Sequence, residues 1–175
     1  ELMIHYGKQF INKYPNIPYI GNFHNWIYVG GKQTLLSYGL IEIDQYDGKL
    51  IGTEDHEALE QFKSDIQWLE TLPLYIKLDV EKGNKPIVIS HASMANVWHF
   101  ADDEKNKEIF TEYALWNRKM PREDVEIFNI FGHTITPKVD TTKHYINVDT
   151  GCHYVNEGYG KLSAYCVETN EVITQ

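Results

Sequence analysis

Two short apolar segments that each end in a histidine constrain this chain most. The first reads Ile87-Val-Ile-Ser-His91 and the second reads Ile127-Phe-Asn-Ile-Phe-Gly-His133. Runs of this length, rich in β-branched and aromatic residues, are typical of buried strands. In open α/β sheets ligands bind beyond the carboxyl ends of the strands, so we expect both imidazoles to project into such a crevice. A neutral imidazole at that place is a natural ligand for a divalent transition metal.

Each histidine taken alone has a second interpretation, because a lone histidine is more often a structural residue that bonds a neighbouring carbonyl. Two histidines in the same context favour the metal. Small residues also adjoin both, which would let a metal and its substrate approach the backbone closely. These residues are Ser90, Ala92, Gly132 and Thr134.

The pattern along the rest of the chain predicts an α/β fold. Apolar residues at helical spacing indicate helices near residues 1–14, 32–38, 54–72 and 105–116, and an aromatic-rich packed loop is expected over 15–31. Gly39 should end the second helix in a left-handed cap, and Thr53 should cap the third, which Pro73 closes. Strands are expected at 74–80, 86–90, 127–131, 144–148 and 161–168, with a short one near Val172. This order indicates an α/β sandwich, part parallel and part antiparallel.

The length of the chain favours a single domain. With 175 residues, of which 42% are apolar, it can bury one sizeable core but hardly two. We expect one domain over residues 1–175, in which a helical and loop region spans 1–80 and a sheet region with the histidine motifs spans 81–175.

Charge and composition exclude several classes of function. A net charge of -9 without a basic cluster argues against a nucleic-acid partner. No apolar run is long enough for a membrane span, and no secretory leader is visible. The two cysteines, Cys152 and Cys166, exclude a disulfide scaffold by number, although a pairing between them stays open. A cytoplasmic protein is the expectation.

Four motifs give the chain a resemblance to a known family. Ser-His91-Ala, Trp-Asn-Arg118, Phe-Gly-His133-Thr and Val-Asp149-Thr-Gly occur in the order and approximate spacing seen in the calcineurin-like metallophosphoesterases of the phosphoprotein-phosphatase type. The bacterial and phage serine/threonine protein phosphatases, together with the symmetrical diadenosine tetraphosphatases, are the most similar branch. The resemblance covers residues 86–168, and less closely 30–39.

The resemblance implies a dinuclear metal centre and roles for four residues. His91 and His133 would bind the second of two divalent metal ions, with manganese favoured and iron or zinc as alternatives. Arg118 would be the catalytic residue that grips the substrate phosphate, a role that suits a planar and permanently charged guanidinium; a surface arginine at a helix end is the alternative. Asp149 would support the metal histidines. The implied reaction is hydrolysis of a phosphorylated protein or a small phosphoester by metal-activated water.

The sequence also departs from the family pattern. The family's Asp-x-His, Gly-Asp-x-x-Asp-Arg and Gly-Asn-His-Glu segments do not occur, and Gly21-Asn-Phe-His24 has the wrong spacing to replace the last of them. Glu1, followed at once by an amphipathic helix, fits the final position of that last motif. We therefore expect a metallophosphoesterase-type sandwich that is incomplete at the N-terminus. An upstream segment or a partner would complete the site, and this chain alone would turn over poorly.

Three other functions remain open on the sequence. A diadenosine tetraphosphatase-type nucleotide hydrolase would use the same residues. A non-catalytic binding protein could keep the fold with half of the metal site. The aromatic stretch from Tyr19 to Tyr28, with Trp26 within it, could form a ligand surface unrelated to phosphate, although loop aromatics more often serve packing.

Overall fold

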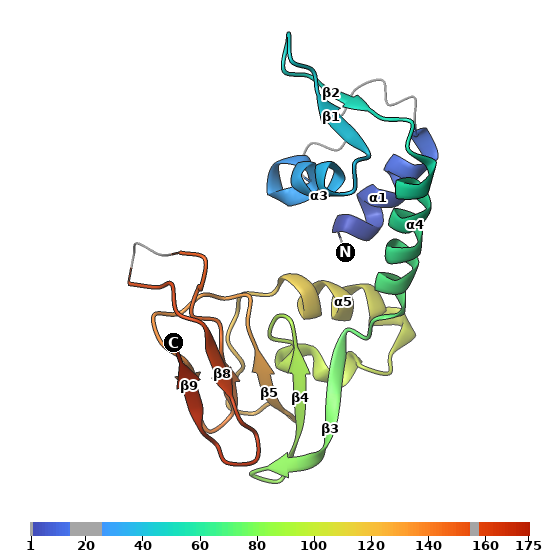
Figure 1. Cartoon of the computed structure of the whole chain (residues 1–175). Coiled ribbons are helices and arrows are strands. Elements are labelled where there is room, and N and C mark those ends of the chain that lie inside the picture. Colours follow the sequence, from blue (N-terminus) through green and yellow to red (C-terminus); the bar gives the residue numbers. More distant parts are fainter. Residues whose placement is uncertain (1, 15–25, 155–157) are drawn as a thin grey trace. The chain divides into compact units, whose positions relative to one another are not determined.

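The computed structural model describes residues 2–14, 26–154 and 158–175 (Figure 1). Its contacts divide the chain into two compact units, Glu1–Leu72 and Pro73–Gln175, here called the N-terminal and C-terminal units. The sequence placed the boundary between the helical and sheet regions at residue 80. The structure moves it to Leu72, because the strand that follows pairs with the sheet. The expectation of a single domain stays a prediction.

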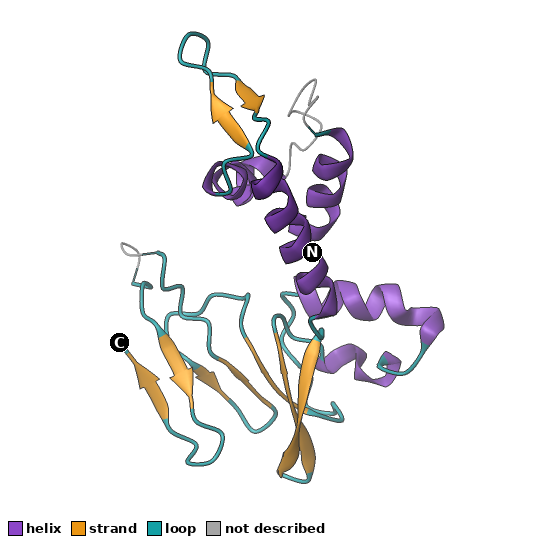
Figure 2. Cartoon of the chain, turned by 45° about the vertical axis from the view of Figure 1, so that its right-hand side comes forward, coloured by secondary structure: helices purple, strands orange, loops and turns teal. Residues whose placement is uncertain are grey.

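The N-terminal unit is mostly helical (Figures 1 and 2). Its elements are α1 (Leu2–Lys13), the short helical turn η2 (Ile27–Gly31), α3 (Lys32–Ser37), the antiparallel pair β1 (Ile41–Ile43) and β2 (Leu50–Gly52), and α4 (His56–Thr71). Their buried side chains form one core of Phe10, Trp26, Ile27, Leu35, Leu40, Ile41, Leu59, Phe62 and Ile66. Burial of such aromatic and aliphatic side chains is the main stabilising term for a unit of this size.

Two helix caps were predicted from the sequence, and the structure confirms one of them. Gly39 has a φ of +76°, and the amides of Gly39 and Leu40 donate to the carbonyls of Leu36 and Leu35, which confirms the left-handed cap after α3. The prediction that Thr53 caps α4 is wrong. Asp55 caps this helix, since its carboxylate accepts from the Ala58 amide at 2.9 Å.

The expected packed loop at 15–31 is partly helical. Residues 15–25 lie outside the described residues, but 26–31 make a kinked helical turn rather than a loop. Trp26 lies in the core and is only 4% exposed, so it is not available as a surface ligand site. A Cβ on Gly31 would come within 2.5 Å of the Trp26 ring, and glycine is therefore required there. The β1–β2 hairpin was not predicted.

The C-terminal unit is built on a mixed sheet. Its elements are β3 (Tyr75–Lys82), β4 (Lys85–Ser90), the 3₁₀ turns η3 (Ala95–Phe100) and η4 (Glu104–Asn106), α5 (Lys107–Trp116), β5 (Phe128–Phe131), β6 (Asp140–Thr141), β7 (Tyr145–Asn147), β8 (Ser163–Tyr165) and β9 (Val172–Thr174). The five-stranded sheet has the order β3-β4-β5-β7-β6, and β8 pairs with β9 in a sheet of their own. The predicted strands are confirmed, while β6 and η3 were missed.

Both parallel and antiparallel pairs occur in the five-stranded sheet, as the sequence predicted. β4 and β7 run parallel to β5, whereas β3 and β6 pair antiparallel at the two edges. Alternate residues of β4 serve the two faces: Val88 packs in a cluster with Phe110 of α5, and Ile87 packs in another with Ile146. The chain is thus mixed α/β, with apolar side chains on both faces of the central strands.

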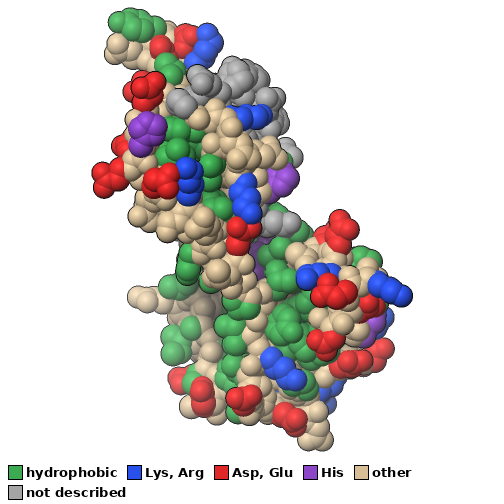
Figure 3. All heavy atoms as spheres, turned by 90° about the vertical axis from the view of Figure 1, so that its right-hand side faces the viewer, with side chains coloured by type: hydrophobic (Ala, Val, Ile, Leu, Met, Phe, Trp, Pro, Cys, Tyr) green, Lys and Arg blue, Asp and Glu red, His purple; other side chains and the backbone are tan. Residues whose placement is uncertain are grey.

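The surface of the C-terminal unit carries apolar side chains along one edge of the sheet. Figure 3 shows hydrophobic groups on the side where β3 lies, and Ile76 and Val80 of this strand are 55% and 51% exposed. Cys152 and Cys166 are not joined by a disulfide. None of the described helices has the length and apolarity that crossing a membrane requires.

Candidate metal centre

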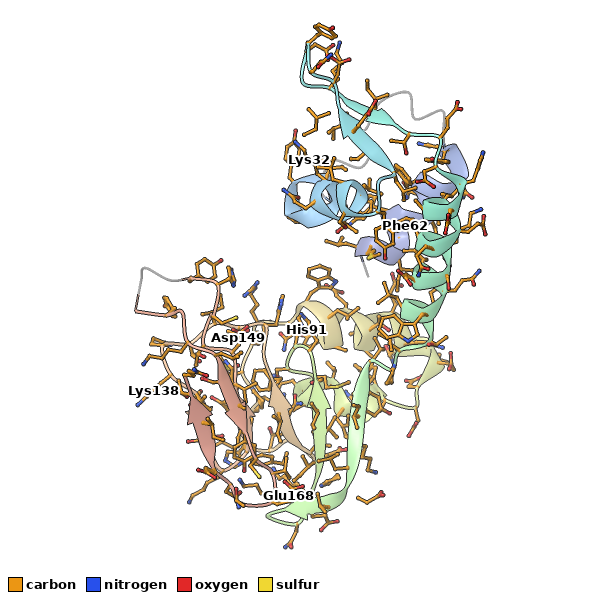
Figure 4. The ribbon with its side chains drawn as sticks, in the orientation of Figure 1. Lys32, Phe62, His91, Lys138, Asp149 and Glu168 are labelled. Atoms are coloured by element: carbon orange, nitrogen blue, oxygen red, sulfur yellow. The ribbon has the colours of Figure 1, made fainter. Side chains whose placement is uncertain are left out.

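Three predicted site residues come together at the carboxyl ends of neighbouring parallel strands. His91 follows β4, His133 follows β5 after Gly132, and Asp149 follows β7. The register pairs Ile89 with Ile130, so β4 and β5 end level with one another. Figure 4 shows His91 and Asp149 at the same end of the sheet. This edge is where an α/β sheet normally binds its ligands.

Backbone hydrogen bonds continue past the strand ends and fix the loops that carry these residues. The Gly132 amide donates to the His91 carbonyl at 2.9 Å, and the Val148 amide donates to the Phe131 carbonyl at 2.9 Å. The loops therefore begin as extensions of the sheet, which limits how far their side chains can move.

The two imidazoles point at each other. Nε2 of His91 lies 3.1 Å from Nδ1 of His133, and the ring centroids are 4.7 Å apart. This distance suits an N–H···N hydrogen bond between neutral rings. Two imidazole nitrogens that bind one ion at about 2.0–2.1 Å lie about 2.9–3.4 Å apart when the angle at the ion is between octahedral and tetrahedral. The pair therefore also fits as two neighbouring ligands of one metal ion.

The surroundings lower the pKa of both imidazoles and so favour their neutral forms. Burial lowers the pKa of His91, helped by the Arg118 charge and opposed by Asp149. Burial also lowers the pKa of His133, together with Arg118 and His91, against a hydrogen bond to the Trp116 backbone and the Asp149 charge. His91 is exposed and His133 half-buried by surface area, yet nearby protein atoms still remove part of the water around both rings. A neutral ring has the lone pair that a metal needs.

Arg118 lies beside the histidine pair, as the motif order predicted. One of its terminal nitrogens donates to the His133 carbonyl at 2.8 Å. An arginine offers five N–H donors, so others remain for a phosphate. Arg118 is therefore adjacent to the imidazoles but also bonded to the loop that holds one of them.

Asp149 binds its own turn rather than either imidazole. Its carboxylate accepts from the Gly151 amide at 3.0 Å, and its carbonyl accepts from the Thr136 amide at 2.9 Å. Gly151 has a φ of +67°, a conformation that suits glycine. The negative charge of Asp149 nevertheless acts on both histidines.

Two buried asparagines hold the site loops, and the sequence analysis missed both. Oδ1 of Asn129 accepts from the Met94 amide at 2.9 Å, and Nδ2 donates to the Val88 carbonyl and the Ser90 hydroxyl, each at 3.0 Å. Asn147 donates to the Thr134 carbonyl at 2.6 Å. The sequence did contain a sign of both residues, because each is a single asparagine within an otherwise apolar strand segment, β5 or β7.

The imidazole pair would supply two ligands to a metal ion. Among residues 2–14, 26–154 and 158–175, no group of three or more His, Cys, Asp or Glu side chains is arranged to hold a metal ion. Glu1, which the resemblance placed at the end of a missing motif, lies outside the described residues, as does Gly21-Asn-Phe-His24. The described residues therefore fit a metal as two of its ligands.

The sequence was compared with protein-family models and with curated proteins. No protein-family model matches the sequence, and no curated protein matches it. The resemblance to a family therefore rests on the four motifs of the sequence.

Proposed function

We propose that this chain is the C-terminal part of a calcineurin-like metallophosphoesterase of the phosphoprotein-phosphatase type, which hydrolyses phosphomonoesters with divalent metal ions. The five-stranded sheet would be one layer of that family's α/β sandwich, and the cytoplasm its compartment. The observation that carries the proposal is the 3.1 Å approach of His91 Nε2 and His133 Nδ1 at the ends of parallel strands.

Each residue of the site has a role in this proposal. His91 and His133 hold one of the two divalent ions, manganese in preference to iron or zinc, through neutral nitrogens. When bound, such ions activate water and neutralise phosphate oxygens. Arg118 orients the phosphoryl group with the N–H donors that it does not spend on the His133 carbonyl. Asp149 supports the turn beside the histidines and offsets part of the positive charge there.

The substrate is a phosphorylated protein or a small phosphoester. The chain carries a net charge of -9, so bound metal would supply most of the attraction for a phosphate. The remaining ligands of the centre would come from an upstream segment or a partner. Without them we expect weak metal binding and slow turnover.

The test measures metal binding and catalysis in the same variants. Binding of Mn²⁺ is followed by the electron paramagnetic resonance signal of the free ion. Hydrolysis of p-nitrophenyl phosphate is followed in this chain and in a form extended upstream. We expect His91→Ala and His133→Ala each to abolish both. His99→Ala is the matched control, because His99 is an exposed histidine of the same unit whose ring lies against Phe100, away from the imidazole pair.

Three outcomes separate the interpretations. Manganese-dependent hydrolysis that disappears in His133→Ala supports the proposed enzyme. Metal binding without hydrolysis in either form favours a binding protein. Binding that survives both histidine substitutions, or falls equally in His99→Ala, would show that the imidazole pair is not the metal site.

A further inference from the structure

His133 has a backbone conformation that few residues other than glycine adopt. Its φ is +66°, in the left-handed region. For a residue with a Cβ this conformation costs of order 1 kcal/mol or more, and it persists only where the surroundings impose it. Something in the structure must therefore hold His133 there.

The first restraint acts on the backbone of His133. A terminal nitrogen of Arg118 donates to its carbonyl at 2.8 Å. A charged donor makes a stronger hydrogen bond than a neutral one. Because the carbonyl direction follows from the backbone dihedrals, this bond favours the left-handed conformation over the alternatives.

The second restraint acts on the ring. A hydrogen bond to the backbone of Trp116, the last residue of α5, raises the pKa of His133 against the effect of burial. The Trp116 ring packs edge to face against the imidazole, with the ring centroids 6.1 Å apart. Nδ1 of His133 faces Nε2 of His91 at 3.1 Å, so Nε2 is the ring nitrogen that the carbonyl of Trp116 would engage.

The segment that supplies both restraints is itself anchored. The Asn117 amide donates to the Ser93 carbonyl at 2.7 Å, in the loop that follows His91, and the Lys119 amide donates to Asn117 Oδ1 at 2.9 Å. Residues 116–118 thus connect the loop after β4 to the loop after β5.

We infer that the Trp116-Asn117-Arg118 segment is a positioning element that holds His133 as the Nε2–H tautomer and presents the lone pair of Nδ1 toward His91. Metal-binding histidines commonly donate their second ring nitrogen to a carbonyl in this way. The inference rests on the proposed function where it concerns metal affinity. It gives Arg118 a second role besides contact with phosphate.

The charge of Arg118 and its positioning role predict opposite changes in cation affinity when Arg118 is removed. Removal of a positive charge near a cation site should by itself strengthen cation binding. Loss of a positioning partner should weaken it about 10–100-fold. Lys119→Met is the matched control, because it removes one exposed positive charge from the adjacent position.

The experiment compares Arg118→Met with Lys119→Met in the full chain. Mn²⁺ affinity is measured by the resonance signal of the free ion, and the His133 tautomer by long-range ¹H–¹⁵N correlation of the metal-free protein. We expect Arg118→Met to bind Mn²⁺ about 10–100-fold more weakly than Lys119→Met, with a mixed His133 tautomer. The unmodified chain should show the Nε2–H tautomer alone.

Two results would overturn the inference: a mixed tautomer in the unmodified chain, or no difference in tautomer between the two variants. If the unmodified chain binds no Mn²⁺, the proposed function fails, while the tautomer measurement still decides the positioning role. Thermal unfolding checks that each variant folds. If Arg118→Met does not fold, Arg118→Lys replaces it, since lysine keeps the charge without the planar fork and should also leave the tautomer mixed.

Discussion

The two units of this chain differ in what they bury. Every buried side chain described in the N-terminal unit is apolar, whereas Ser93, Asn129, Asn147 and Thr150, the buried polar residues, all lie in the C-terminal unit. The reason lies in their backbones. Helices satisfy most of their own N–H and C=O groups, but the loops beyond parallel strands do not.

In the C-terminal unit, side-chain amides take over that task. Asn129 satisfies an amide and a carbonyl on the strand and loop that carry His91. Asn147 satisfies the Thr134 carbonyl on the loop that carries His133 and the Asp149 amide in the next loop. A buried hydrogen-bond network of this kind specifies one arrangement of its loops. The comparison teaches that apolar burial stabilises both units, while the buried polar residues of the C-terminal unit also fix the geometry of the site.

Among the variants considered, removal of a fully buried aromatic ring from the N-terminal unit should give the largest loss of stability. Phe62 is fully buried, and its ring contacts Phe10 and Tyr38 edge to face. We expect Phe62→Ala to lower the free energy of unfolding of this unit by about 3–5 kcal/mol, measured by urea denaturation. The resonances of His91 and His133 should stay in place. A shift in them would break the division of roles between the units.

Asn129→Ala should combine a smaller loss of stability with a change in the site. It leaves the Met94 amide and the Val88 carbonyl without their partner, at a cost of about 2–4 kcal/mol. Unlike Phe62→Ala, it should shift the His91 resonances and weaken metal binding. Ile130→Val, at the next position of β5, is the control and should cost about 0.5–1.5 kcal/mol. Unchanged histidine resonances in Asn129→Ala would show that the amide is not needed to place the loop.

The sequence allowed the strands and the meeting of the site residues to be predicted, because both follow from short-range patterns. Apolar runs located β4 and β5, and the rule for parallel strand ends brought His91 and His133 to one edge. The roles of Asn129 and Asn147 could not be predicted, since a buried amide bonds partners that only the register of three strands brings near. The cap of α4 was missed because Thr53 and Asp55 are both good capping residues two positions apart.

Replacement of one glycine in each unit by alanine should cost less stability than the changes above and should cost different amounts in the two units. Gly151 has a φ of +67°, and a Cβ there would lie 2.7 Å from Ile135 Cγ2. Gly39 has a φ of +76° with no atom within 4 Å of such a Cβ. We expect Gly151→Ala to cost about 2–3 kcal/mol through strain and overpacking, and Gly39→Ala only about 1 kcal/mol, by urea denaturation. Equal costs would mean that the turn beside Asp149 yields as freely as an open helix end.

The smallest expected loss of stability comes from ionisation of one tyrosine in each unit, and it should appear only at high pH. Burial, a hydrogen bond to Asp65 and the charge of that carboxylate raise the pKa of Tyr38 from 10.0 to about 12. In the C-terminal unit, burial and Asp140, which accepts from the Tyr145 hydroxyl at 2.7 Å, raise the pKa of Tyr145 to about 12.

Because both pKa values are raised in the folded state, the stability linked to them is fully present below about pH 10 and is lost as the pH rises through about 12. Urea midpoints between pH 8 and pH 12 should therefore fall for both units. Tyr38→Phe should flatten the fall for the N-terminal unit alone, and Tyr145→Phe for the C-terminal unit alone. If either variant flattened both curves, the two units would unfold as one, and the difference in their buried polar residues would describe composition rather than separate stability.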